Sequence, residues 1–254
     1  MTKFNLKIQP ILYFLILSFS IAFSQTNSEI QLDTFKLFDK TRNREIPIAV
    51  YTQKNQKIDY KQNIVIFSHG YGQNKGGDYL AYSYLTNKLA ENGYFVVSIQ
   101  HELSTDSLLP LTGIPQIVRR PFWDRGAENI NFVIAELRQK YPKLNFKQIT
   151  LIGHSNGGDM TALFPQKYPD IVAKIITLDN RRMALPKSLN LKTYSLRSSD
   201  QLPDEGVIPT DAELLKFNIK IIKLHNTIHN AMDDNGTTQQ KDEINQYVLT
   251  FLKE

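Results

Sequence analysis

The amino-acid sequence predicts an α/β fold built on a mostly parallel β-sheet with helices on both faces. Short, almost wholly apolar strand segments alternate with helical segments along most of the chain. This is the pattern of parallel strands that are buried on both faces. The first two strand segments instead flank a polar turn, which is typical of an antiparallel hairpin. We see no internal repeat and no low-complexity linker, so the pattern favours one domain.

The N-terminal third supplies the hairpin and the first buried strands. Residues 34–39 and 45–52 are the two hairpin strands, and Asn63–Ser68 (NIVIFS) is a short, nearly all-apolar strand. Residues 79–92 carry apolar side chains at helical spacing and end before a glycine, which indicates a helix. Residues 94–99 are again apolar and are expected to form a buried strand.

The middle of the chain combines a long loop with two helices around a strand. Residues 101–122 contain three prolines and are expected to be a loop. A helix is expected at 124–140, with one apolar face. An apolar strand at 148–152 then leads into a helix at 156–168 that is rich in small residues at its start.

The C-terminal third continues the alternation. The expected strands are residues 171–178, Lys192–Arg197 and 219–224. The expected helices are Asp211–Phe217 and an amphipathic closing helix at 242–252. Ligand chemistry in such a sheet gathers at the carboxyl ends of the strands.

The first residues are expected to be a secretory signal peptide and not part of the fold. Lys3 and Lys7 precede an apolar run, and small residues then precede Gln25. We expect cleavage near Ser24/Gln25, which leaves residues 25–254 as a single periplasmic or extracellular domain. An uncleaved membrane anchor is the alternative; after cleavage no stable membrane insertion is expected.

Composition excludes several classes of protein. The chain has no Cys, which excludes disulfides, thiolate metal sites and a cysteine nucleophile. Without Lys3 and Lys7, 28 of the 30 basic residues remain against 25 acidic ones, so the mature charge is about +3. This small excess, without a basic stripe carrying interleaved aromatics, argues against a nucleic-acid partner.

The segment from Gly153 to Gly157 reads Gly-His-Ser-Asn-Gly and lies between the strand at 148–152 and the following helix. A Gly-x-Ser-x-Gly sequence in this context is typical of a nucleophile elbow, which exposes a serine on a sharp turn. The two glycines allow the strand and the helix to approach closely around it. Ser155 is therefore the candidate nucleophile; the alternative is a serine that merely caps the helix.

A nucleophilic serine needs a histidine base, and a carboxylate that orients the base. Only His225 and His229 follow Ser155 along the chain, both in the loop after the last strand. We prefer His229, which is deeper in the loop and can turn back over the elbow. Asp200 and Asp179 each follow a strand, and either can reach the histidine; Asp200 is preferred and Asp179 is the alternative.

An oxyanion hole needs two backbone N–H groups near the serine. The residue after the nucleophile, Asn156, supplies one at the start of its helix. The second is expected from the glycine-rich turn after the NIVIFS strand, where Tyr71 is the preferred donor and Gly70 and Gly72 are the alternative donors. The alternative for this turn is an ordinary glycine turn.

Four segments carry a resemblance to the α/β-hydrolase family, at 67–72 (FSHGYG), 89–102 (LAENGYFVVSIQHE), 152–159 (IGHSNGGD) and 175–183 (IITLDNRRM). Within the family they are similar to the branch of platelet-activating-factor acetylhydrolases and bacterial cutinase-like polyester hydrolases. The resemblance implies an eight-stranded sheet, an ester substrate and no cofactor or metal. The acetylhydrolase pattern implies an acid at Asp179 and the polyester-hydrolase pattern one at Asp200, so the resemblance leaves both open.

These observations predict an exported serine hydrolase that cleaves small-molecule or lipid-like carboxylic esters through a Ser-His-Asp triad and an acyl-enzyme. An amidase or peptidase with the same triad is one alternative. A catalytically inactive binding protein on the same fold is the other.

Overall fold

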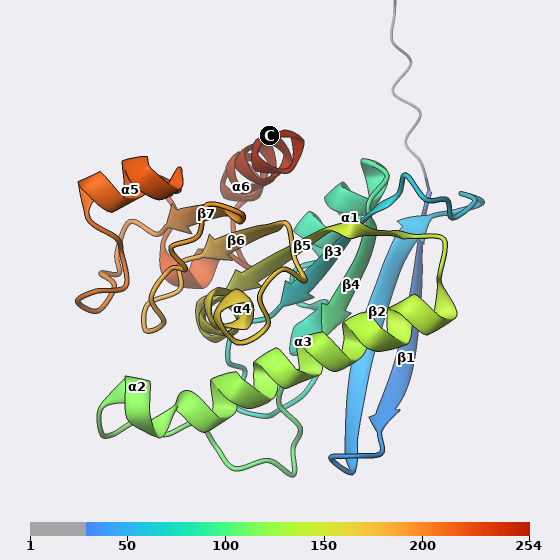
Figure 1. Cartoon of the computed structure of the whole chain (residues 1–254), viewed down its shortest axis with the longest axis horizontal. Coiled ribbons are helices and arrows are strands. Elements are labelled where there is room, and N and C mark those ends of the chain that lie inside the picture. The colour runs from blue at the N-terminus through green and yellow to red at the C-terminus, as the bar shows by residue number, and fades with distance from the viewer. Residues whose placement is uncertain (1–28) are drawn as a thin grey trace, which may run out of the picture.

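The computed structural model describes residues 29–254, so the expected signal peptide at residues 1–24 lies outside it. Eight strands form one sheet in the order β1-β2-β4-β3-β5-β6-β7-β8 (Figure 1). The strands are β1 (Ile30–Asp39), β2 (Arg44–Gln53), β3 (Asn63–Ser68), β4 (Phe95–Ile99), β5 (Asn145–His154), β6 (Lys174–Leu178), β7 (Lys192–Arg197) and β8 (Lys220–Lys223). Within residues 29–254, no helix is long and apolar enough to span a membrane.

The sheet is mixed at one edge and parallel elsewhere. β1 pairs antiparallel with β2, and β2 pairs antiparallel with β4. Every pairing from β4 through β3 to β8 is parallel. The predicted fold class, a mostly parallel eight-stranded sheet with an N-terminal antiparallel hairpin, is thereby confirmed.

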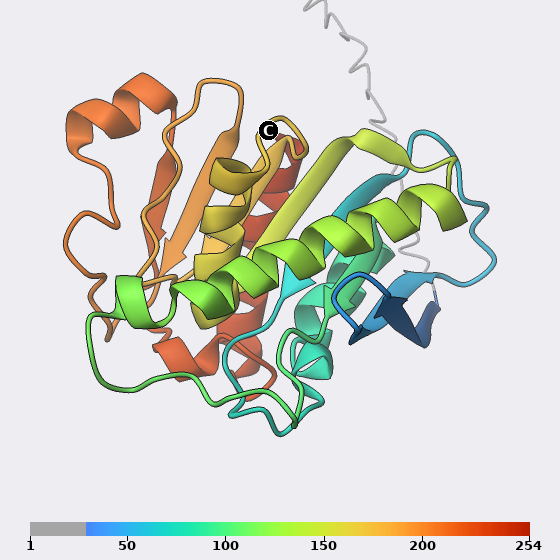
Figure 2. The same ribbon diagram turned by 60° about the horizontal axis from the view of Figure 1, so that its bottom comes forward.

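Two helical layers cover the sheet (Figure 1). α3 (Arg120–Lys140) and α4 (Ser155–Lys167) lie together on one face, where α3 runs across α4 (Figure 2). α1 (Ser83–Glu91) and α6 (Thr238–Lys253) contact each other on the other face. The helices α2 (Pro115–Val118) and α5 (Asp211–Phe217) are short.

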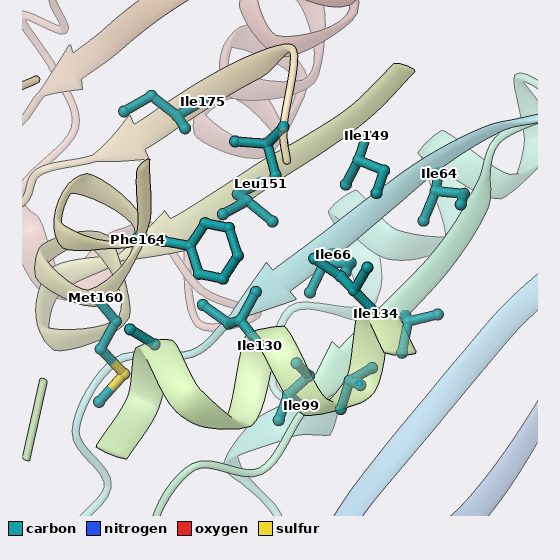
Figure 3. Close-up of a cluster of buried hydrophobic side chains, with 14 of the residues drawn as sticks. Ile64, Ile66, Ile99, Ile130, Ile134, Ile149, Leu151, Met160, Phe164 and Ile175 are labelled. Carbon is teal, nitrogen blue, oxygen red and sulfur yellow. The ribbon is translucent and has the colours of Figure 1, made fainter. Parts of the chain in front are cut away.

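Each face of the sheet has its own hydrophobic core. The core under α3 and α4 gathers buried residues from the central strands and both helices, among them Ile66, Leu151, Ile130 and Phe164 (Figure 3). The core under α1 and α6 uses the alternate residues of the same strands, such as Val65 and Ile152. Each fully buried aliphatic side chain contributes about 1.5–3 kcal/mol, so the central strands hold the site that follows them rigidly.

Several element boundaries differ from those predicted; α1, for example, begins at Ser83 and not at residue 79. Two of the differences have a clear local cause. The expected loop at 101–122 contains α2 and the first turn of α3, because Pro115 and Pro121 stand in first turns, where proline needs no hydrogen-bonded N–H. The closing helix begins at Thr238, before the expected residue 242, because Thr237 and Gln240 form a capping box. Neither change moves the strand ends that surround the candidate serine.

Candidate active site

Ser155 lies at the junction of β5 and α4, at the carboxyl end of the sheet. Its φ of 52° is in the left-handed region, which is costly for a residue with a side chain and is typical of a nucleophile elbow. Gly157 permits the turn, since a Cβ there would come within 2.3 Å of the Ser68 carbonyl oxygen. The backbone is therefore packed tightly around the serine, as the sequence predicted.

The imidazole of His229 bridges the serine and a carboxylate. His229 Nε2 lies 2.9 Å from Ser155 Oγ, and His229 Nδ1 lies 2.6 Å from Asp179 Oδ2. His229 belongs to a short 3-10 turn, His229–Ala231, in the loop after β8. The three side chains form the Ser–His–Asp relay expected of a nucleophilic serine. His225, the alternative base, is exposed.

Asp179 is completely buried and fully hydrogen-bonded. Its φ of 55° turns the chain sharply after β6. Besides His229, the carboxylate accepts hydrogen bonds from the Ser198 amide and hydroxyl, and Arg197 Nη2 lies 3.1 Å from Oδ1. Burial alone would raise the pKa of Asp179, but the bond from His229 and the Arg197 charge outweigh it and lower the pKa. The carboxylate therefore stays ionised beside the imidazole.

The structure corrects the preference for Asp200 as the partner of the imidazole. Asp200 Oδ1 accepts a hydrogen bond of 2.7 Å from the backbone N–H of His229, not from its ring. Asp200 thus holds the turn that carries the histidine, while Asp179 orients the ring. Asp179, and not Asp200, lies beside His229 Nδ1 because it follows β6, the strand next to β5 and Ser155. Asp200 follows β7, which is one strand further away.

The two amides expected at the oxyanion hole lie beside the serine. Asn156 is the second residue of α4, where a backbone N–H has no partner within the helix. The turn containing Tyr71 passes over the serine, since a Cβ on the neighbouring Gly70 would lie 3.4 Å from Ser155 Cβ. In the described part of the chain, neither the Tyr71 nor the Asn156 amide donates to a protein acceptor. Both remain candidates for binding an oxyanion.

A buried network that sequence reasoning missed fixes the side chain of Asn156. Asn156 Nδ2 donates to Glu102 Oε1 over 2.9 Å, and Asn156 Oδ1 accepts from Trp123 Nε1 over 2.8 Å. Burial raises the pKa of Glu102, and the nearby His69 and Arg125 oppose that shift. The signal that could have found Glu102 is a carboxyl residue shortly after the buried strand β4.

His154, next to Ser155, is held as a neutral ring. Its Nδ1 lies 2.8 Å from the Tyr82 hydroxyl, which also accepts from the Gly70 amide. The rings of His154 and His229 lie 4.6 Å apart. Burial and the neighbouring His229 lower the pKa of His154 to about 3. Tyr82 therefore ties the end of β5 to the turn that contains the Tyr71 amide.

Two cavities meet at Ser155 and His229. One, of about 290 Å³, is lined by Leu109, Leu111, Arg119, Arg181 and Arg182 among others. The other, of about 180 Å³, is lined by Asp78 and Asp233 among others. Tyr71 lines both, and its hydroxyl accepts from the Leu109 amide over 2.9 Å, which ties the 101–118 segment to the site. No group of three or more His, Asp or Glu able to hold a metal ion occurs among residues 29–254.

Solved structures share this architecture. A fungal esterase of Rhizomucor miehei matches with a TM-score of 0.66 at 13% identity, covering 91% of this chain and 84% of that one. A dienelactone hydrolase assigned in Klebsiella pneumoniae matches with a TM-score of 0.61 at 13% identity, covering 89% and 99%. The chain has the α/β-hydrolase fold. Ser155 lies at the strand-to-helix turn between β5 and α4, which is the position of a nucleophile elbow.

Sequence comparisons also match serine hydrolases, over the part of the chain that contains Ser155. A family model described as serine aminopeptidase, S33, matches residues 59–178 of the α/β-hydrolase domain. A probable serine hydrolase of Drosophila melanogaster is 27% identical over 103 residues, which are 41% of this chain. The match spans 29% of that protein's own length. The narrower resemblance to acetylhydrolases and polyester hydrolases is carried by the sequence segments alone and stays a prediction.

Proposed function

We propose that this protein is a serine hydrolase of carboxylic esters, with Ser155, His229 and Asp179 as its catalytic triad. The observation that carries the proposal is the continuous relay of 2.9 Å from Ser155 Oγ to His229 Nε2 and 2.6 Å from His229 Nδ1 to Asp179 Oδ2. The esterases among proteins of the same fold support an ester as substrate.

In the proposed mechanism Ser155 attacks the ester carbonyl while His229 Nε2 takes its proton. Asp179 stabilises the imidazolium that forms and keeps the ring in the tautomer with Nδ1–H. The amides of Tyr71 and Asn156 bind the oxyanion of the tetrahedral intermediate. His229 then protonates the leaving alcohol, which gives an acyl-enzyme, and later activates the water that hydrolyses it. No cofactor or metal takes part in these steps.

The test combines covalent labelling with hydrolysis. A fluorophosphonate probe should label the wild-type protein at Ser155, and Ser155→Ala should not be labelled. The wild type should hydrolyse 4-nitrophenyl butyrate, and Ser155→Ala should lose at least about 10³-fold of that activity. A folded wild type that neither reacts nor hydrolyses any ester would support the inactive binding protein instead.

An amidase or peptidase with the same triad is the second candidate, favoured by the description of the matching family model. Both activities share the acyl-enzyme and differ in the leaving group. The rates on 4-nitrophenyl butyrate and on butyryl 4-nitroanilide separate them: the proposal expects the ester to be cleaved far faster, beyond the intrinsic difference in the reactivity of the two compounds.

The proposal also retains export through the predicted signal peptide at residues 1–24. Mass spectrometry of the protein from an exporting bacterial host should then show a mature chain that begins near Gln25.

A further inference from the structure

The larger cavity at the nucleophile is lined by three arginines. Arg119 comes from the junction of α2 and α3, and Arg181 and Arg182 come from the loop after β6. The same cavity contains Ser155 and His229, so a molecule bound at the serine would lie beside these guanidinium groups. The positive charge is therefore part of the cleft itself.

The arginines are only partly neutralised. Arg182 pairs with Asp204, whereas Arg181 contacts the neutral Gln201 amide and Arg119 donates to the Pro110 carbonyl oxygen over 3.0 Å. Across residues 29–254, neither Arg119 nor Arg181 forms an ion pair. Burial and the neighbouring Arg182 lower the pKa of Arg119, as expected of cations packed together with few carboxylates.

In the part of the chain that the structure describes, one carboxylate, that of Asp159, lines this cavity, and it is already hydrogen-bonded. Asp159, 3% exposed, accepts hydrogen bonds of 2.9 Å each from the backbone amides of Arg182 and Met183. Asp159 belongs to α4, the helix that starts at the nucleophile. It therefore anchors the arginine loop to the helix of Ser155, and its one negative charge offsets only part of the charge of the three guanidinium groups.

The cavity on the other side of the serine has the opposite charge. Among residues 29–254, Asp78 and Asp233 line it, and no Lys or Arg does. An anionic group would be repelled there and attracted to the arginine-lined side, so the charges fix the direction in which a charged ester binds.

We propose that the preferred substrates are esters carrying an anionic group, a carboxylate, on the arm that enters the cavity of Arg119, Arg181 and Arg182. Guanidinium groups bind carboxylates through paired, charge-assisted hydrogen bonds. The inference rests on the proposed function and names the substrate class of that site.

The test compares esters matched in length. Mono-4-nitrophenyl adipate should be hydrolysed with a kcat/KM at least about tenfold above that of 4-nitrophenyl hexanoate. The paired compounds 4-acetoxybenzoate and phenyl acetate ask whether the anion belongs to the leaving group instead. A preference for the anionic ester in either pair supports the proposal and shows whether the acyl arm or the leaving group enters the arginine-lined cavity. If neither pair shows such a preference, the proposal is overturned.

Arginine variants identify the source of the preference. Arg119→Gln and Arg181→Gln should each lower the anionic-to-neutral ratio of kcat/KM by about fivefold or more. Arg120→Gln is the matched control: Arg120 is exposed, pairs with Asp124 and does not line the cavity, so the ratio should stay unchanged. A ratio that responds equally to Arg120→Gln would show only a general charge effect and would overturn the proposal.

Binding measurements separate this inference from the proposed function. Ser155→Ala protein should bind monomethyl adipate more tightly than methyl hexanoate in calorimetry, and the added Arg119→Gln change should abolish the difference. If no ester is hydrolysed but this difference is found, the serine-hydrolase proposal fails and the anion site stands. If esters are hydrolysed but the difference is missing, the anion site fails alone.

Discussion

Ser155 and Asp179 adopt left-handed backbone at the ends of neighbouring strands, with φ of 52° and 55°. A left-handed backbone conformation costs a residue with a side chain about 1–2 kcal/mol. The geometry of Ser155 and Asp179 persists because residues 149–154 of β5 and all of β6 are buried, and because Asp179 is hydrogen-bonded on both oxygens. At the residue scale, backbone strain at two strand ends places the side chains that reach His229.

The first prediction concerns Glu102, which holds the side chain of Asn156. Glu102→Gln keeps a carbonyl acceptor for Asn156 Nδ2 and should change stability and ester kcat/KM little. Glu102→Leu leaves that buried amide unpaired, and we expect it to lower the free energy of unfolding by about 1–3 kcal/mol. The kcat/KM of Glu102→Leu should also fall, because the side chain of Asn156 is no longer fixed and the backbone N–H of Asn156, the expected oxyanion donor, shifts with it. Denaturant unfolding and 4-nitrophenyl butyrate rates measure both; equal effects of the two variants would contradict this role.

At the scale of elements, the elbow depends on the close approach of β3 to α4. Gly157 makes the approach possible: a Cβ there would meet the carbonyl oxygens of Ser68 and His69 at 2.3 and 2.4 Å. Both contacts are with backbone, which cannot move without displacing β3. Gly126 on α3 is equally close to a neighbour, but the neighbour is the end of the Met160 side chain, at 2.2 Å.

This difference gives the second prediction. Gly157→Ala should destabilise the protein by several kcal/mol and slow fluorophosphonate labelling of Ser155, because β3 or the elbow must shift. Gly126→Ala should cost less, since Met160 can adopt another rotamer and alanine is favoured over glycine in a helix by about 1 kcal/mol. Urea unfolding of both variants provides the comparison. A cost for Gly126→Ala as large as that for Gly157→Ala would contradict the assignment.

At the scale of the whole molecule, buried carboxyl groups couple the stability of the fold to pH in opposite directions. Asp179 has a lowered pKa, so its contribution is present above its ordinary pKa and is lost as the pH falls through the folded value. Burial raises the pKa of Asp159 to about 6. As the pH rises, the unfolded chain therefore loses the proton of Asp159 near pH 4, whereas the folded protein keeps it until about pH 6.

The third prediction follows from that sign. Between about pH 4 and pH 6 the unfolded chain binds fewer protons at this position than the folded one, so Asp159 makes stability fall as the pH rises. The free energy of unfolding of the wild type relative to Asp159→Asn should drop by about 2 kcal/mol across this window. Denaturant melts at several pH values measure the difference, and a difference that is constant with pH would refute the assignment.

The sequence predicted the sheet, and it singled out Ser155 and His229, whose side chains the fold brings together, because these depend on patterns that are local in the chain. Apolar strands alternate with helices, the elbow is contiguous, and His229 is one of only two histidines after Ser155. The choice of Asp179 over Asp200 was not predictable, because it depends on the order of strands in the sheet and on the sharp turn at Asp179.

Glu102 and the arginine-lined cavity show the same limit. The arginines were visible in the sequence as two pairs, Arg119-Arg120 and Arg181-Arg182. Only the folded chain shows that the cavity includes both members of the second pair and one member of the first. Glu102 reaches Asn156, 54 positions away in the chain, and no sequence spacing encodes that contact.

The most direct test of the central claim is the rate of fluorophosphonate labelling of Asp179→Asn and Asp200→Asn, followed by intact mass spectrometry on protein with verified folding. This rate reports serine nucleophilicity without requiring knowledge of the natural substrate. We predict that Asp179→Asn slows labelling by about 10³-fold or more, because the imidazole loses its anionic partner. Asp200→Asn should stay within about tenfold of the wild type, because it alters one hydrogen bond to the His229 backbone. Slow labelling of Asp200→Asn beside wild-type labelling of Asp179→Asn would contradict the triad.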